Sequence, residues 1–365
     1  MLYRPFRTMT SSYCRLYPTS LSSLVLLSAL MLGTGGSVYA STPVSAMVSL
    51  AQGRTTPQAD DALDAGFRLL DRGSDPELRE AVAHFTTARQ QYQSAGDLAG
   101  EGRALQALGD TYDLLNDLPS ALTAYEQALQ LWLAVDDHRQ ESATLTHLGR
   151  IHARLNNPQE ALGFYERALP ISQGIGDQAE EAHILRRMGD AYDDLNDLDQ
   201  ARTRYNQALR LYRQVLSTYR AEGNRQEVAK TLSRMGGAYA GLENYPQAIQ
   251  FHTQALAIHR ELGHRRREAD TLSAIGWAYH RSENYQQALQ THTQALATYR
   301  ELQHRRGEAD ALQRVGLAHG GLENYPQALN FYNQALPIFR EIRDREGEAH
   351  TLNSLGVAYS DLEDI

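Results

Sequence analysis

Seven glycines recur at a nearly constant interval and constrain the fold of this chain more than any other feature. They are Gly109, Gly149, Gly189, Gly236, Gly276, Gly316 and Gly356. Five of the six intervals are 40 residues and one is 47, and Tyr or His follows each glycine by three residues. Internal periods of this length are typical of stacked repeat proteins, in which each unit needs its neighbours to bury its apolar face. We therefore expect one repeat domain whose function resides on its surface.

Each repeat has the residue spacing of two amphipathic helices. Around Gly276, the residues Leu272, Ile275 and Tyr279 are spaced by three and four positions, and the apolar spacing resumes after a turn at Ala288. Such spacing places apolar side chains on one face of a helix. A glycine inside the first helix costs about 1 kcal/mol relative to alanine, so we expect a packing reason for it. We predict that the two helices cross closely there, with an alanine of the second helix facing the glycine.

Two places depart from the regular repeat. The 47-residue interval includes the stretch from Arg202 to Glu222, and seven extra residues are almost two helical turns, so we predict a longer second helix there. The sequence stops at Ile365, just after the first helix of an eighth pair. That last helix is either a closing cap, or the sequence is a fragment of a longer protein.

The repeat resembles the tetratricopeptide repeat, in which the first helix carries Leu-Gly-x-x-Tyr and the second carries alanine, an aromatic residue and alanine. This chain has these motifs at Leu108-Gly109-Asp110-Thr111-Tyr112 and at Ala121, Tyr125 and Ala128. The resemblance covers about residues 59–365. It implies an all-α fold, a right-handed α-solenoid of antiparallel helix pairs that winds into a superhelix. We assign residues 58–365 to this domain, with about seven helix pairs and a final single helix.

The period of 40 residues is six longer than the usual 34 of this family. Together with residues 334–338 (Gln-Ala-Leu-Pro-Ile) and 347–353 (Gly-Glu-Ala-His-Thr-Leu-Asn), it resembles a bacterial subgroup that is often fused to CHAT domains, which are caspase-like proteases. This sequence contains no recognisable CHAT domain.

Residues 1–40 have the organisation of a signal peptide. They begin with basic residues, continue with an apolar run from Leu21 to Leu32, and end in Val38-Tyr39-Ala40, with small residues where a signal peptidase cleaves. The apolar run is shorter than the ~20 residues that span a bilayer. We predict cleavage, no stable membrane span afterwards, and a periplasmic or secreted protein; a retained anchor is the alternative. Residues 41–57 are predicted to form a flexible linker.

Charge and composition argue against several classes of function. The net charge is −9, and residues 1–40 contain three arginines and no acidic residue, so nucleic acid is not the expected partner. The single cysteine, Cys14, precedes the apolar run, so the mature chain would offer no thiolate for metal or catalysis. His252 and His292 are better interpreted as core residues than as a metal pair. No motif of a catalytic site occurs, so we expect no enzyme activity, no metal and no cofactor.

In tetratricopeptide repeat proteins the first helices line a concave groove, so the resemblance implies where ligands bind here. We infer these candidate groove residues: Arg150, Arg154, Arg186, Arg187, Arg234, Trp277, Arg281 and Arg314. Trp277 lies outside the apolar stripe of its helix and is expected to be partly exposed, either as an aromatic anchor for a ligand or as a cover for a neighbouring helix. Two basic clusters, residues 264–267 and 304–306, are interpreted as solvated helix starts balanced by nearby acids, although they could bind an anionic partner.

Three hypotheses about function follow. We favour an exported, non-enzymatic scaffold that binds a protein or peptide through its concave groove. The alternative is the sensor or substrate-recruiting part, or a truncated N-terminal fragment, of a system that pairs these repeats with a CHAT protease. The third is self-association, in which the last helix stacks on the first pair of another copy.

Overall fold

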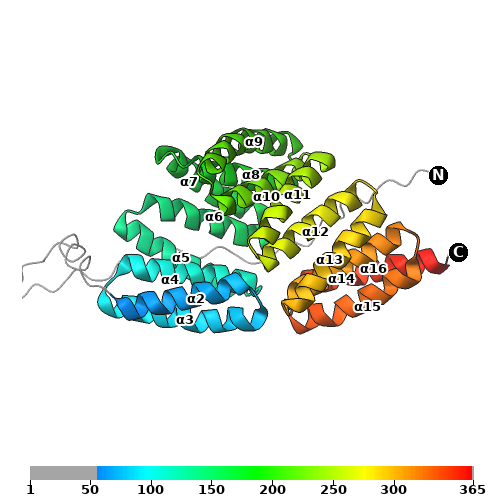
Figure 1. Cartoon of the computed structure of the whole chain (residues 1–365), viewed down its shortest axis with the longest axis horizontal. Coiled ribbons are helices and arrows are strands. Elements are labelled where there is room, and N and C mark those ends of the chain that lie inside the picture. The colour runs from blue at the N-terminus through cyan, green and yellow to red at the C-terminus, as the bar shows by residue number, and fades with distance from the viewer. Residues whose placement is uncertain (1–55, 364–365) are drawn as a thin grey trace, which may run out of the picture. The chain divides into compact units, whose positions relative to one another are not determined.

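The computed structural model describes residues 56–363, which form fifteen helices and no strand (Figure 1). The predicted signal peptide, residues 1–40, and nearly all of the predicted linker, residues 41–57, lie outside the described residues. Within residues 57–363, no helix is both long and apolar enough to cross a bilayer.

The helices alternate between a first and a second member of seven pairs. The first helices are α2 (Pro57–Arg72), α4 (Leu98–Leu114), α6 (His138–Arg154), α8 (Gln178–Asp194), α10 (Arg225–Gly241), α12 (Arg265–Arg281) and α14 (Arg305–Gly321). The second helices are α3 (Asp75–Ala95), α5 (Leu118–Val135), α7 (Pro158–Gly174), α9 (Leu198–Ala221), α11 (Tyr245–Glu261), α13 (Tyr285–Glu301) and α15 (Tyr325–Glu341). A single helix, α16 (Arg345–Glu363), follows the last pair.

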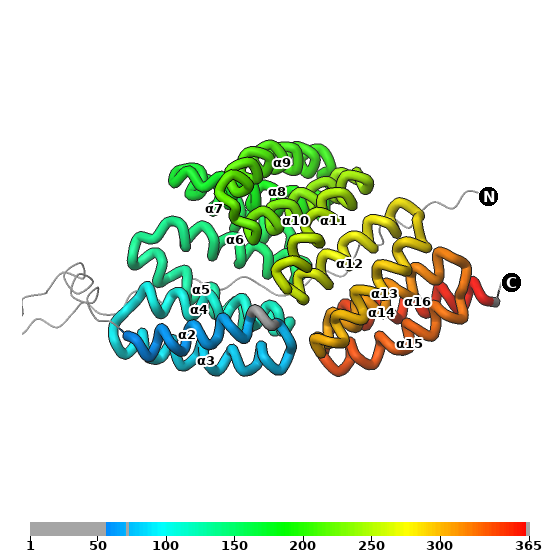
Figure 2. Tube along the Cα trace, in the orientation of Figure 1, coloured from blue at the N-terminus to red at the C-terminus, as the bar shows by residue number. Residues whose placement is uncertain are grey.

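Each helix packs mainly on the helix before it and the helix after it. The chain therefore progresses through space in sequence order, as the trace from α2 to α16 in Figure 2 shows. This arrangement confirms the predicted right-handed α-solenoid of antiparallel pairs. Its core consists of successive clusters of buried apolar side chains, each shared by neighbouring helices.

Polar caps at the turns explain where the helices begin. Asp97, Asp137 and Asp177 each precede a first helix, and their carboxylates accept a hydrogen bond from the backbone N–H three residues later. These contacts satisfy donors that have no partner within the helix. Gly176 and Gly263 end turns with φ near +70°, a conformation that glycine adopts without steric cost.

A ring, and not the predicted alanine, faces the repeat glycines of the six complete later pairs. A Cβ added at Gly149 would lie 2.4 Å from Cε1 of Tyr165, and one added at Gly276 would lie 2.5 Å from Cε1 of His292. The same contact joins Gly109 to Tyr125, Gly189 to Tyr205, Gly236 to His252, and Gly316 to Tyr332. The expected close approach is present, but the second helix fills the space with a large buried ring. The glycine is needed because any side chain would occupy the volume of that ring.

His252 and His292 occupy this ring position in two repeats and are buried, which supports their interpretation as core residues. Burial lowers the pKa of His252 to about 4, with a smaller contribution from Arg186. Burial and the nearby Arg314 lower the pKa of His292 to about 3. Both imidazoles are therefore neutral in the folded protein at neutral pH.

We expect the free energy of unfolding to fall in acid and His292→Phe to reduce that fall by about 2 kcal/mol between about pH 7 and pH 5. The pKa of His292 is lower in the folded state than its ordinary value of 6.5, so its contribution is complete above about pH 6.5 and is lost as the pH falls towards 3. Phe85 already fills the equivalent position against Gly66. Urea unfolding at several pH values measures the effect, and the exposed His350→Gln is the control. Equal acid sensitivity in both variants would contradict it.

Candidate functional site

The first helices line a concave groove, which contains a cavity of about 490 Å³. Its walls come from α2, α4, α6, α10 and α12 and from the residue that caps α12. The lining residues are Leu70, Asp110, Asp113, Leu114, His147, Arg150, Gln226, Lys230, Arg234, His264, Arg266, Arg267 and Asp270. Two of the predicted groove residues, Arg150 and Arg234, line this cavity.

The first pair of helices reaches the amino ends of α12 and α14, which lie beside it in the superhelix although they are distant in sequence. A carboxylate oxygen of Asp75 accepts a hydrogen bond from the backbone N–H of Arg305 at 3.2 Å. The guanidinium of Arg306 donates to the side-chain oxygen of Asn116. Asp75 at the start of α3 and Asn116 in the turn after α4 therefore contact the start of α14.

Arg150 and Arg154, both predicted groove residues, are held by an acid of the preceding repeat. Their guanidinium groups both donate to the buried carboxylate of Asp113, and Arg154 also donates to the side-chain oxygen of Asn116 at 2.5 Å. These contacts cross from α6 to α4. The two arginines therefore join neighbouring repeats, and little of their hydrogen-bonding capacity is left for a ligand.

Arg186, Arg187 and Arg234 gather around His183 on α8 and α10, and we call these four residues the arginine cluster. Burial lowers the pKa of His183 well below its ordinary value, and all the charged neighbours that add to this shift are cationic. Burial, together with the adjacent Arg186, lowers the pKa of Arg187 to about 10. Three guanidinium groups therefore lie around a histidine that is neutral at neutral pH.

The carboxylate of Asp190 forms ion pairs with two arginines of this cluster. Asp190 pairs with Arg186 at 2.8 Å and with Arg187 at 3.5 Å. Gly237 stands after Arg234 where Asp190 stands after Arg187, so Arg234 has no acid in that position. Within residues 56–363, the Nε atoms of Arg186 and Arg187 and the hydroxyl of Tyr212 are buried without a hydrogen-bond partner. This position could hold an anionic group, because buried polar atoms normally have partners.

Trp277 and Arg281, two further predicted groove residues, pack against Tyr245 at the start of α11. The Trp277 ring meets the Tyr245 ring edge-on at a centroid distance of 5.9 Å. The Arg281 guanidinium lies over both rings, at 5.7 Å from the Trp277 centroid, and donates to the Tyr245 hydroxyl at 3.1 Å. Trp277 is partly exposed, as expected, and it also covers a neighbouring helix.

An apolar stripe in the later repeats was missed as a candidate site at the sequence level. Leu317 and Val357 follow their glycines as Trp277 follows Gly276, and both are exposed. They line a cavity of about 270 Å³ between α14 and α16. The equivalent positions in the first three of these repeats are charged, at Asp110, Arg150 and Asp190, so the register of the repeat alone could have revealed the change. The groove is thus cationic near α8 and α10 and apolar near α12 to α16.

The predicted basic clusters take part in ion pairs that repeat along one edge. Arg265 pairs with Glu268 at 2.5 Å and also with Glu301, while Arg305 pairs with Glu308 at 2.7 Å and with Glu341 at 2.6 Å. These contacts support the interpretation as balanced helix starts.

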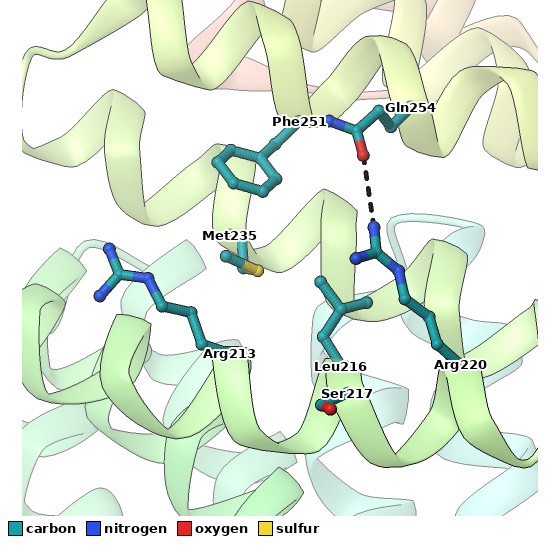
Figure 3. Close-up of a pocket in the computed structure, with 7 residues that line it drawn as sticks. All are labelled: Arg213, Leu216, Ser217, Arg220, Met235, Phe251 and Gln254. Atoms are coloured by element: carbon teal, nitrogen blue, oxygen red, sulfur yellow. Dashed lines mark hydrogen bonds between the residues drawn. The ribbon is translucent and has the colours of Figure 1, made fainter.

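The longer second helix predicted from the 47-residue interval is present. Helix α9 has 24 residues, whereas α11 and α13 have 17 each. Its extension forms a depression of about 420 Å³ with α10 and α11, lined by Leu216, Met235 and Phe251 among others (Figure 3). Arg220 reaches across it to the side-chain oxygen of Gln254 at 3.5 Å.

The structure is a stack of antiparallel helix pairs, in which a Tyr or His ring of the second helix packs on a glycine of the first. This is the architecture of a helical repeat protein of the tetratricopeptide type. The tetratricopeptide repeat family matches residues 77–134, 117–174, 140–214, 227–301 and 307–365, and the chain belongs to this family. No curated protein matches the chain. Within residues 56–363, no group of three or more His, Cys, Asp or Glu side chains could hold a metal ion.

Several solved structures share this fold. A Rap protein complexed with Competence and Sporulation Factor is similar at 15% identity and a TM-score of 0.60, covering 82% of this chain and 80% of that one. The Rap conjugation gene regulator of the plasmid pLS20, in complex with the Phr* peptide, is similar at 12% identity and a TM-score of 0.59, covering 78% and 74%. The apo form of RapI has 14% identity and a TM-score of 0.53, covering 78% and 99%. At these identities the likeness shows the fold alone.

Proposed function

We propose that this protein is a non-enzymatic scaffold that binds an extended, acidic segment of a protein partner in its concave groove. The observation that carries the proposal is the arginine cluster, in which Arg186, Arg187 and Arg234 lie around His183 and Asp190 pairs with two of the three arginines. Arg234 and Arg267 also line the cavity of the groove. Charge-assisted hydrogen bonds to a carboxylate would satisfy these guanidinium groups better than water does in a partly buried groove.

The groove also favours a particular order of residues in that segment. Its cationic part, on α8 and α10, is followed along the superhelix by Trp277, Leu317 and Val357. A segment that carries acidic residues at one end and large apolar residues at the other would match both parts. Exposed aromatic and aliphatic side chains in a groove are common anchors in binding. The pLS20 regulator, which shares the fold, binds the Phr* peptide, and this precedent supports a peptide ligand.

A labelled peptide with four glutamates followed by two leucines tests the proposal by fluorescence anisotropy. We expect binding that weakens as salt rises, and at least a tenfold loss for the Gln counterpart of the peptide, since each charge-assisted bond contributes about 1.5–3 kcal/mol. Arg187→Ala with Arg234→Ala should cause a similar loss, whereas Arg210→Ala on the second helix α9 should not. Equal binding of the Glu and Gln peptides, or no binding of either, would contradict the proposal.

We further propose that the protein acts outside the cytoplasm, in the periplasm or secreted. The support is the basic start, the short apolar run and the small residues before Ser41 in the sequence. The mass of the protein recovered from its own cells tests this proposal, because it shows whether residues 1–40 have been removed. A chain that retains residues 1–40 and is found in the cytoplasm would contradict export.

A second candidate function is recruitment of substrates to a CHAT protease, on this chain's continuation or on a separate chain. The 40-residue period and residues 334–338 and 347–353 favour it. A neighbouring gene that encodes a His/Cys protease dyad would support this candidate, and a pull-down without any protease would count against it.

A further inference from the structure

In two of the described helix pairs, a tyrosine of the second helix donates a hydrogen bond to an aspartate of the first helix. The Tyr92 hydroxyl on α3 donates to Oδ1 of Asp60 on α2. The Tyr299 hydroxyl on α13 donates to Oδ1 of Asp270 on α12 at 2.7 Å. In both pairs the tyrosine lies seven residues after the ring that packs on the glycine of the first helix, and the aspartate lies six residues before that glycine. The two hydrogen bonds are therefore one feature of the repeat, which we call the tyrosine–aspartate contact.

The pair of α8 and α9 has the tyrosine of this contact but not the aspartate. Tyr212 lies seven residues after Tyr205, the ring that packs on Gly189, and His183 lies six residues before Gly189. Tyr212 is 1% exposed, and its hydroxyl is buried without a hydrogen-bond partner among residues 56–363. The Nδ1 atom of His183 is buried without a partner in the same range. This pair therefore keeps the buried donor and has a histidine at the position of its acceptor.

Three arginines lie near Tyr212. Burial raises the pKa of Tyr212, and Arg234, Arg186 and Arg187 are close enough to oppose that rise. The Nε atoms of Arg186 and Arg187 are buried without a hydrogen-bond partner in the described part of the chain. A carboxylate accepts hydrogen bonds at two oxygens, so one carboxylate could accept from the Tyr212 hydroxyl and from a guanidinium group together.

The nearby acid, Asp190, does not take the place of the aspartate in this pair. Its Oδ1 accepts a hydrogen bond from the Tyr205 hydroxyl at 3.0 Å. Its Oδ2 pairs with Arg186 at 2.8 Å and with Arg187 at 3.5 Å. Both oxygens of Asp190 are therefore engaged by other groups, and the Tyr212 hydroxyl is not among their donors.

We propose that the Tyr212 hydroxyl and the guanidinium groups of the arginine cluster bind a carboxylate of the ligand, in the position that Asp60 and Asp270 occupy in their own pairs. The side chain of Arg187 is 29% exposed, so a carboxylate reaches the cluster from solvent beside it. The hydroxyl itself is covered, and an arginine side chain moves aside when the ligand binds. The carboxylate comes either from an acidic residue of the bound segment, in which case the inference rests on the proposed function, or from a free carboxylic acid.

Binding of the labelled glutamate peptide to Tyr212→Phe tests this site in the full chain. The substitution removes only the hydroxyl, and we expect the affinity to fall at least tenfold, because hydrogen bonds to charged groups are the stronger ones. The melting temperature should not fall, since the hydroxyl loses no hydrogen bond to a described residue. Tyr92→Phe is the matched control. It should lower the melting temperature, because it breaks the bond to Asp60, and it should leave peptide binding unchanged.

His183→Asp returns the carboxylate to this pair and gives a second test. We expect the melting temperature to rise, because the new carboxylate accepts from Tyr212 as Asp270 accepts from Tyr299. The rise should be smaller in the Tyr212→Phe background, since the contact needs both groups. The variant should also bind the glutamate peptide at least tenfold more weakly, because a carboxylate of the chain itself occupies the site. Equal changes of melting temperature in the two backgrounds would contradict the assignment.

Sodium acetate at about 100 mM, compared with sodium chloride at the same concentration, distinguishes the two sources of the carboxylate. If a free carboxylate binds, acetate should raise the melting temperature of the wild-type chain more than that of Tyr212→Phe. This result would support the site even if the glutamate peptide did not bind, an outcome that refutes only the proposed function. Peptide binding that depends on Tyr212, without an effect of acetate, would assign the carboxylate to the bound segment.

The inference is overturned if Tyr212→Phe changes neither the affinity for the glutamate peptide nor the effect of acetate. Peptide binding that is equally tight in the wild type and in Tyr212→Phe would then leave the proposed function standing and place the acidic residues elsewhere in the groove.

Discussion

Gly149→Val is expected to lower the free energy of unfolding by about 3 kcal/mol, at the upper end of the cost of overpacking a core. The first added carbon would lie 2.4 Å from Cε1 of Tyr165, a ring that is itself fully buried between α6, α7 and the next repeat. The ring cannot move aside without displacing its neighbours in a closely packed interior. Urea unfolding followed by circular dichroism measures the loss.

Gly163→Val is the matched control for this substitution. Gly163 lies in the middle of α7 with nothing within 4 Å, so the same change removes a helical glycine without a collision. We expect its stability to rise by a few tenths of a kcal/mol, because valine is the better helix former. Tyr165→Ala should cost less stability in the Gly149→Val background than in the wild-type chain, which would show that the ring and the added side chain compete for the same space. Equal effects at the two glycines would contradict the ring contact.

The interval between glycines was enough to predict the fold, whereas the partner of each glycine depends on how two helices cross. The period is a property of the chain itself, and few architectures repeat every 40 residues. Whether an alanine or a ring of the second helix reaches Gly276 depends on the relative rotation and shift of α12 and α13. Both kinds of residue occur on the inner side of α13, at Ala288 and His292, so spacing alone did not distinguish them.

The eight predicted groove residues differ in what they contact, and so in what they can do. Arg150 and Arg154 are bound by Asp113, which lies 37 and 41 residues earlier, close to one repeat length. Comparing each arginine with the residues one repeat length earlier in the sequence would have suggested this pairing. Arg234 differs because Gly237 replaces the acid found at Asp190. Such differences are visible in the aligned repeats, whereas the burial that lowers the pKa of Arg187 needed the folded structure.

The Asp113 contact leads to the second large expected effect. Asp113→Ala should lower the free energy of unfolding by about 2 kcal/mol, because it leaves the guanidinium groups of Arg150 and Arg154 without their carboxylate. Breaking a fully buried pair typically costs about 3–5 kcal/mol, and the value is reduced here because the arginine side chains are 22% and 23% exposed. Solvent and the nearby Asp110, at 3.9 Å from Arg150, compensate part of the loss.

Glu261→Ala is the control, because Glu261 also joins two helices through an arginine, Arg225, but at an exposed edge of the solenoid. Exposed ion pairs contribute little to stability and are screened by salt, so we expect no measurable change in the urea midpoint.

The double variant Asp113→Ala with Arg150→Met should recover part of the loss of stability, since it removes one of the two uncompensated cations. If Asp113→Ala changed the free energy of unfolding as little as Glu261→Ala, Arg150 and Arg154 would be free to bind a ligand. The distinction between these structural arginines and the ligand-binding pair, Arg187 and Arg234, would then be wrong. A large loss of stability for Asp113→Ala would mean that Arg150 and Arg154 serve mainly to bind a carboxylate of the chain itself. Arg187 and Arg234 would then be the first arginines to test for ligand binding.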